Sequence, residues 1–192
     1  MAHVTPVVIG GVIWPDAESQ KSINEIRAKW DPHLTVIAPH ITIIFPTESA
    51  IPPAEAAERL TEAVEGLGSF PVTLDRVSSL PQLAREWPHA TAALLAYPNA
   101  VNAIFLLSGK GTAEMLDLKA RIAVALGLST PLVQYPPYLT LGQTLTDERY
   151  QAALRSLSGY APDYSFEVES FDFLTQTESG GWETARTISL AP

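Results

Sequence analysis

Two short stretches of similar pattern, about half a chain apart, most constrain how this 192-residue sequence can fold. The first reads Pro-His-Ile-Thr-Ile from residue 39, and the second reads Pro-Tyr-Leu-Thr-Leu from residue 137. Successive side chains of a strand point to opposite faces, so His40 and Thr42 share one face, as do Tyr138 and Thr140. Each stretch therefore predicts a strand that is apolar on one side and carries two polar groups on the other.

The elements around these stretches recur in the same order in the two halves of the chain. Apolar periodicity and turn residues predict a strand that begins at residue 40 and further strands at residues 4–14, 70–80, 91–97, 101–107, 138–143, 165–176 and 182–190. Helices are expected at residues 16–30, 53–67, 112–126 and 147–157, and a loop at 81–89. Each half thus has a strand, a helix, a Pro-preceded strand with the polar pair, and a second helix. We expect an α+β fold in which residues 1–192 form one bilobal, pseudo-symmetric domain.

Composition narrows the class of protein. The absence of cysteine excludes disulfides, thiolate metal sites and cysteine nucleophiles, and it fits a reducing compartment. A net charge of −9 argues against a broad grip on nucleic acid, which needs a basic face. The apolar run at residues 4–14 is shorter than the roughly 20 residues that span a bilayer. We therefore expect a cytoplasmic monomer that binds neither an extended duplex nor a membrane, and the composition leaves a small nucleotide or a short RNA end possible as a partner.

Residues 108–112, Ser-Gly-Lys-Gly-Thr, share only part of the pattern of a phosphate-binding loop. The Walker motif needs Ser or Thr directly after the lysine, and Gly111 stands there. We therefore interpret Lys110 as a solvated surface lysine.

Taken singly, either polar pair fits a structural role, because a lone histidine or tyrosine on a strand commonly packs or bonds locally. Together they resemble the two His-x-Thr-x motifs of the 2H phosphoesterases, a family that includes bacterial 2′-5′ RNA ligases and RNA 2′,3′-cyclic phosphodiesterases. Asp-Pro-His at residues 31–33 and Leu-Gly-Gln at 141–143 match the surroundings of those motifs in bacterial members. The resemblance implies antiparallel sheets that face a central cleft, with helices on the outside.

The resemblance also implies roles for the four polar residues. His40 would be the general base, and the hydroxyls of Thr42 and Thr140 would hold the phosphate as charge builds on its oxygens. The family chemistry needs no metal or other cofactor, and the sequence has no evident cluster of metal ligands.

The second motif is degenerate, because Tyr138 stands where the family has its second histidine and no histidine follows His89. A phenol with a pKa of about 10 can donate a proton at neutral pH but is a poor base. Three readings stay open: a hydrolase with Tyr138 as the acid, a nucleotide- or phosphate-binding module without turnover, and an unrelated α+β domain in which both motifs only pack. His33, in His-Leu-Thr-Val at residues 33–36, is an alternative imidazole.

Overall fold

The computed structural model describes residues 6–87, 102–128, 137–143 and 145–192. Its helices and strands in chain order are β1 (Val7–Ile13), α1 (Ala17–Trp30), β2 (Ile41–Ser49), α2 (Pro53–Ala63), β3 (Phe70–Ser79), α3 (Leu80–Glu86), β4 (Ile104–Ser108), α5 (Thr112–Leu126), β5 (Tyr138–Gly142), α6 (Asp147–Ser156), β6 (Tyr164–Val168), β7 (Ser170–Gln176) and β8 (Trp182–Ser189).

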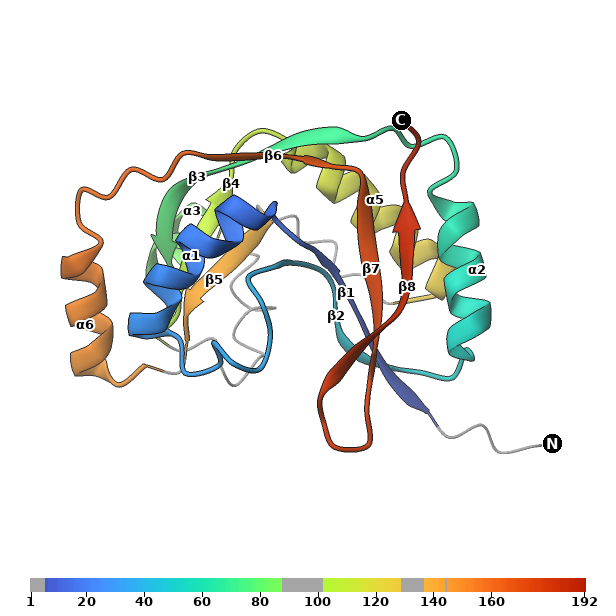
Figure 1. Ribbon diagram of the computed structural model, residues 1–192, viewed down its shortest axis with the longest axis horizontal. Helices are drawn as coiled ribbons and strands as arrows, with labels where there is room; N and C mark the ends of the chain where they lie inside the picture. Colours follow the sequence, from blue (N-terminus) through green and yellow to red (C-terminus); the bar gives the residue numbers. More distant parts are fainter. Residues whose placement is uncertain (1–5, 88–101, 129–136, 144) are drawn as a thin grey trace.

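The strands form one eight-stranded sheet in the order β6-β3-β4-β5-β2-β1-β7-β8. Every pairing between these strands is antiparallel, and the sheet is curled. The halves meet at its centre, where Ile41 of β2 pairs with Leu139 of β5. Helices α6 and α2 lie at opposite ends of the molecule, with the central strands between them (Figure 1). The predicted α+β fold with an antiparallel sheet is confirmed.

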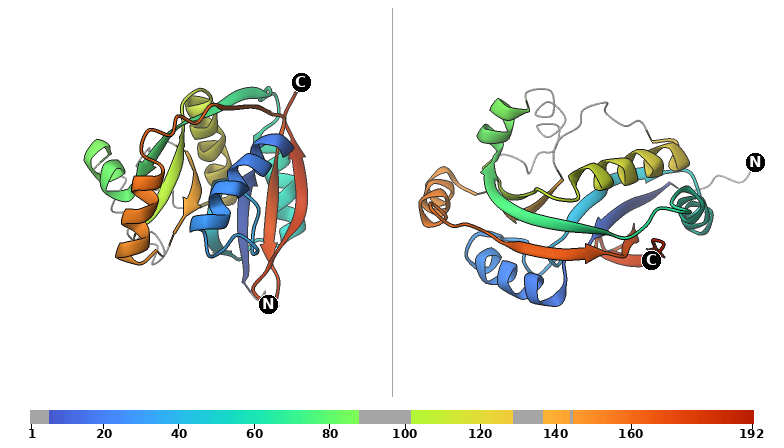
Figure 2. Two further views of the ribbon diagram at one scale, coloured as in Figure 1. Left: turned by 60° about the vertical axis from the view of Figure 1, so that its left-hand side comes forward. Right: turned by 90° about the horizontal axis from the view of Figure 1, so that it is seen from above.

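The two halves of the chain exchange elements. Strand β3 belongs to the first half of the sequence but pairs with β4 and β6, and β7 in turn pairs with β1. Helix α1 packs against β5, and α5 packs against β2. Helices α2 and α5 lie side by side at one end of the molecule (Figure 2). This reciprocal crossing is the pseudo-symmetry that the repeated order of elements predicted, and it puts the two motif strands next to each other.

The central strands bury one face in the core. Exposure is 0 % for Ile41, 4 % for Ile43, and 0 % for both Leu139 and Leu141. Burying an aliphatic side chain of this size stabilises the fold by about 1.5–3 kcal/mol. The apolar alternation in the two motifs therefore fixes which way the strands face, because a one-residue slip would expose all four side chains.

Local signals placed two helix ends correctly. Asp16 caps α1, because its carboxylate accepts hydrogen bonds from the main-chain N–H groups of Glu18 (2.9 Å) and Ser19 (3.0 Å). Gly127 ends α5 with φ of 62°, a left-handed conformation that glycine adopts without strain.

Three expectations were wrong in detail. Residues 81–86 are not loop but lie in α3, whose Leu80 and Leu83 are buried in a small apolar cluster. The single strand expected at 165–176 is two strands, because β6 pairs with β3 and β7 with β1. His40 precedes the first residue of β2 rather than starting it. The strand expected at 91–97 lies outside the described residues.

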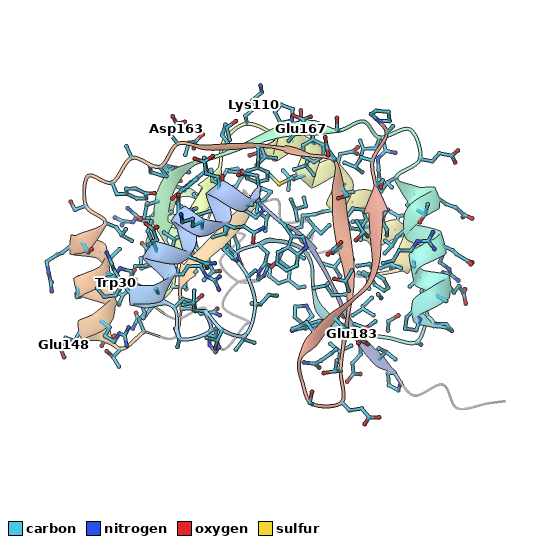
Figure 3. All side chains as sticks on the ribbon, viewed as in Figure 1. Trp30, Lys110, Glu148, Asp163, Glu167 and Glu183 are labelled. Carbon is cyan, nitrogen blue, oxygen red and sulfur yellow. The ribbon has the colours of Figure 1, made fainter. Side chains whose placement is uncertain are left out.

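Lys110, the lysine of the partial phosphate-loop pattern, lies at the surface of the molecule. Lys110 and Asp163 point outward from the same edge of the molecule (Figure 3). Lys110 is exposed, and its main-chain N–H donates to the Thr73 hydroxyl at 2.9 Å. The position fits the interpretation of Lys110 as a solvated lysine. Within the described parts of the chain, no helix has both the length and the apolarity needed to cross a membrane.

Candidate functional site

The four polar residues of the two motifs lie on one face of the central strands, which we call the shared face. His40, Thr42, Tyr138 and Thr140 are partly exposed, whereas the residues that alternate with them are buried. Ile41 pairs with Leu139, so the antiparallel register, continued by one residue on each side, sets His40 opposite Thr140 and Thr42 opposite Tyr138. Directly opposed residues have Cβ atoms about 5 Å apart. The fold therefore brings together two motifs that begin 98 positions apart in sequence.

The His40 ring is anchored through one nitrogen. Its Nδ1 lies 2.8 Å from the carbonyl oxygen of Ala38. A carbonyl oxygen can only accept, so Nδ1 carries the hydrogen and Nε2 of the neutral ring is the acceptor. The main chain thus selects the tautomer in which Nε2 can take a proton.

The surroundings of His40 favour its neutral form. Burial lowers the pKa of His40 below its ordinary value, and the positive charge of Arg27 acts in the same direction. The hydrogen bond to Ala38 and the charge of Asp31 oppose this shift without cancelling it. At neutral pH the ring is therefore largely unprotonated, which is the state that a general base needs.

A buried ion pair shapes the loop that leads to His40. Arg27 Nη2 lies 2.7 Å from Asp31 Oδ2, and the two side chains are 3 % and 2 % exposed. The same Nη2 donates to the carbonyl of Ile37 at 2.9 Å, while Asp31 Oδ1 accepts the main-chain N–H of His33 at 2.9 Å. Arg27 thus fixes Ile37, and the carbonyl of the next residue, Ala38, accepts the hydrogen bond from the His40 ring. Opposite charges four residues apart across a helix end could have indicated this pair from sequence.

The structure gives His33 a place in this turn. The main-chain carbonyl of His33 accepts from Val36 N at 2.9 Å, and Thr35 is exposed. His33 and Thr35 therefore lie in a turn, without the strand alternation that brings His40 and Thr42 to one face.

Tyr138 packs against an apolar cluster that was not predicted from the sequence. The ring centroids of Tyr138 and Phe105 are 4.5 Å apart, with an interplanar angle of 48°. Phe105 belongs to a buried cluster that also contains Leu83 of α3, and Tyr138 packs against its edge. Helix α3 therefore supports the tyrosine side of the shared face, and it was missed because residues 81–89 were predicted to be loop.

The two threonine hydroxyls are available for a ligand. Among the described residues, no protein group hydrogen-bonds the hydroxyl of Thr42 or of Thr140. Both side chains are partly exposed on the shared face. Likewise, residues 6–87, 102–128, 137–143 and 145–192 contain no group of three or more His, Cys, Asp or Glu arranged to hold a metal ion.

Trp14, which was not predicted to belong to the site, borders His40 on the side away from β5. The two ring centroids are 5.8 Å apart, with an interplanar angle of 70°, so the rings meet edge to face. Trp14 follows β1 directly, and β1 pairs with β2 so that Ile13 lies opposite Ile41. The contact is thus a consequence of sheet register that no local sequence pattern reveals.

Comparison with known proteins assigns the family. The profile of the 2'-5' RNA ligase superfamily matches residues 15–180, so the chain belongs to this family. A Bacillus licheniformis protein named "Putative phosphoesterase" is 22% identical over 187 residues, which cover 94% of this chain and 97% of that protein. The resemblance drawn from the two motifs is thereby confirmed.

Solved structures show the same fold. E. coli LigT complexed with 3'-AMP aligns with a TM-score of 0.62 and 17% identity, over 98% of this chain and 100% of that one. E. coli LigT complexed with NADP+ aligns with a TM-score of 0.58 and 15% identity, again over 98% and 100%.

Proposed function

We propose that this chain is a 2H-type phosphoesterase that hydrolyses a 2′,3′-cyclic phosphate on a small nucleotide or a short RNA end. The observation that carries the proposal is the shared face, on which the Ile41–Leu139 register sets His40 and Thr42 against Thr140 and Tyr138. One phosphate placed over this register would be within reach of a base, an acid and two hydroxyl donors.

His40 is the general base in this proposal. Its Nδ1–H is held by the Ala38 carbonyl at 2.8 Å, and its lowered pKa keeps Nε2 unprotonated at neutral pH. Nε2 takes a proton from water as the water oxygen attacks phosphorus. The hydroxyls of Thr42 and Thr140 donate to the phosphate oxygens on which negative charge accumulates.

Tyr138 is the general acid. As the bond between phosphorus and one ribose oxygen breaks, the phenol gives its proton to that oxygen, and the product is a phosphate monoester with a free ribose hydroxyl. The imidazolium of His40 then loses its proton to solvent and the phenolate regains one, so that each turnover consumes one water. Ligation by the reverse reaction would need Tyr138 as a base, a role for which a phenol is unsuited at neutral pH.

The relatives and the charge of the chain support this substrate class. E. coli LigT has been crystallised with 3'-AMP, ATP and NADP+, all of which are small nucleotides. The net charge of −9 disfavours tight binding of an extended duplex. We also propose a monomeric, cytoplasmic enzyme in which residues 1–192 act as one bilobal domain and no cofactor takes part.

A binding module without turnover is the second candidate. The packing of Tyr138 against Phe105, with centroids 4.5 Å apart, favours it, because a phenol held in an apolar cluster is constrained in reaching a ribose oxygen. In that case the two threonines and His40 would retain a nucleotide without opening its phosphate.

One assay separates the two candidates. Wild type, His40→Ala and Tyr138→Phe are compared for hydrolysis of 2′,3′-cyclic AMP, and binding of the same nucleotide is measured by calorimetry. We expect turnover by the wild type and loss of turnover in both variants. Binding without wild-type turnover would favour the module, and wild type that neither binds nor hydrolyses cyclic nucleotides would overturn both candidates.

A further inference from the structure

Trp14 is tied to a second strand pair through its indole nitrogen. Nε1 donates to Asp172 Oδ2 of β7 at 2.9 Å. The carboxylate also accepts from the hydroxyls of Thr187 (2.6 Å) and Thr184 (3.1 Å) on β8. Three donors therefore converge on Asp172 and leave it little freedom to move away from the indole.

This arrangement lies on the shared face. Val12 of β1 pairs with Thr42 on one side and with Asp172 on the other, so Thr42 and Asp172 point to the same face. Trp14 is two residues beyond Val12 and therefore shares that face as well. Trp14 and Asp172 thus extend the shared face from β2 across β1 to β7, on the side where a ligand would lie.

We propose that Trp14, held in place by Asp172, is a positioning residue that sets the orientation of the His40 ring. The inference rests on the proposed function for its catalytic meaning, whereas its structural content concerns His40 alone. A hydrogen bond at Nδ1 fixes the tautomer but still lets the imidazole tilt about that bond. The edge-to-face contact with Trp14 removes this freedom, and the bond to Asp172 keeps the indole from rotating with it.

Orientation matters because proton transfer needs Nε2 within hydrogen-bond reach of the attacking water. A group displaced by about 1 Å from its productive position can cost roughly 100-fold in rate. Loss of the indole is therefore expected to lower kcat and to leave KM nearly unchanged, because Trp14 acts through His40 and not on the substrate.

The direct test follows the ring resonances of His40 by NMR, together with kcat and KM for 2′,3′-cyclic AMP, in Trp14→Leu, Trp14→Phe and Asp172→Asn. Trp182→Leu, which changes a tryptophan on β8, is the matched control. We expect Asp172→Asn to shift the His40 resonances although Asp172 does not touch His40. The same change in the Trp14→Phe background should shift them much less, because phenylalanine has no N–H for the carboxylate to hold.

The kinetic expectation is a fall in kcat of roughly 10- to 100-fold for Trp14→Leu with KM within about twofold, and a smaller fall for Trp14→Phe, which keeps an aromatic edge. His40 resonances that do not respond to Asp172→Asn would overturn the inference, as would a rise in KM at constant kcat. Thr187 is exposed, and Thr187→Val removes one of the hydrogen bonds that hold Asp172. This variant gives the same NMR readout if Trp14→Leu fails to fold. Coupled resonances without any wild-type turnover would support the positioning of His40 and refute the proposed function.

Discussion

Ile41 of β2 pairs with Leu139 of β5, and this pair joins the two halves of the sheet. Both side chains are fully buried, so the residues on either side of them are forced to the opposite, accessible face. Each threonine therefore lies across from the first residue of the other motif. A site built this way depends on both strands at once, and its chemistry can be altered from either.

Restoring the missing imidazole tests the degenerate motif. Tyr138→His is expected to raise hydrolysis of 2′,3′-cyclic AMP, because an imidazole titrates near neutral pH and donates a proton more readily than a phenol. Positioned acid catalysis contributes about 100- to 10,000-fold, so a gain of at least tenfold is the expected scale. Tyr138→Phe is the matched control and should lower the rate. Equal rates in the two variants would show that this position does not take part in proton transfer.

The pH dependence of the reaction follows from the environment of His40. Burial lowers the pKa of His40, so the base is still active below its ordinary titration point of about 6.5. We expect kcat/KM to fall on acidification with a midpoint below pH 6.5, and an NMR titration of the His40 ring to give the same midpoint. His40 also makes the stability of the fold depend on pH. Because its pKa is lower in the folded than in the unfolded state, the stabilisation present above the unfolded pKa is lost as the pH falls through the folded pKa. A midpoint above pH 7 would contradict this assignment.

The buried ion pair should matter far more than an exposed one. Arg27→Met leaves the Asp31 carboxylate buried without its partner, and we expect about 3–5 kcal/mol of destabilisation in urea unfolding. Arg59→Met breaks a pair with Glu55 of the same i,i+4 spacing, but those side chains are 45% and 49% exposed. That control should cost no more than about 1 kcal/mol. Similar losses in the two variants would argue against a special role for the Arg27–Asp31 pair.

Much of this architecture could be read from local sequence. The alternation around His40 and Tyr138 predicts two strands with a shared orientation, and Asp16 and Gly127 mark helix ends through main-chain chemistry that acts within a few residues. Helix α3 was not predictable in this way, because Leu80 and Leu83 are buried in a cluster with Ala103, Phe105 and Leu107, which lie some twenty residues or more further along the chain.

The contact between His40 and Trp14 could not be predicted from local sequence either, because it depends on how β1 and β2 pair.

Ser78 of β3 carries a buried hydroxyl whose effect on stability can be measured. Its side chain is 1% exposed, and among the described residues its hydroxyl has no hydrogen-bond partner. A buried hydroxyl without a partner is costly, so Ser78→Ala should leave the free energy of unfolding unchanged or raise it by up to about 1 kcal/mol. Ser108→Ala is the control, since it removes a 2.8 Å bond between the Ser108 and Thr112 hydroxyls and should destabilise by about 1 kcal/mol. Clear destabilisation by Ser78→Ala would show that the hydroxyl is satisfied in solution.

Gly142 allows α1 to approach β5 closely. A Cβ atom at this position would lie 2.9 Å from the carbonyl oxygen of Trp30. This oxygen belongs to the main chain, so it cannot move away as readily as the end of a flexible side chain. Gly142→Ala is therefore expected to destabilise the protein by about 1–3 kcal/mol in thermal or urea unfolding. Gly68→Ala is matched to it, because a Cβ there meets nothing within 4 Å. Equal stability of the two variants would mean that α1 can move away from β5 at little cost.

The proposed mechanism makes His40 the base of a phosphoesterase whose phosphate site spans both motifs. It is tested by following the conversion of 2′,3′-cyclic AMP with phosphorus NMR, in wild type and in His40→Ala of unchanged fold. We predict that the wild type produces a phosphate monoester and that His40→Ala is at least about 100-fold slower. Equal rates in the two proteins, or no conversion by the wild type, would contradict this mechanism.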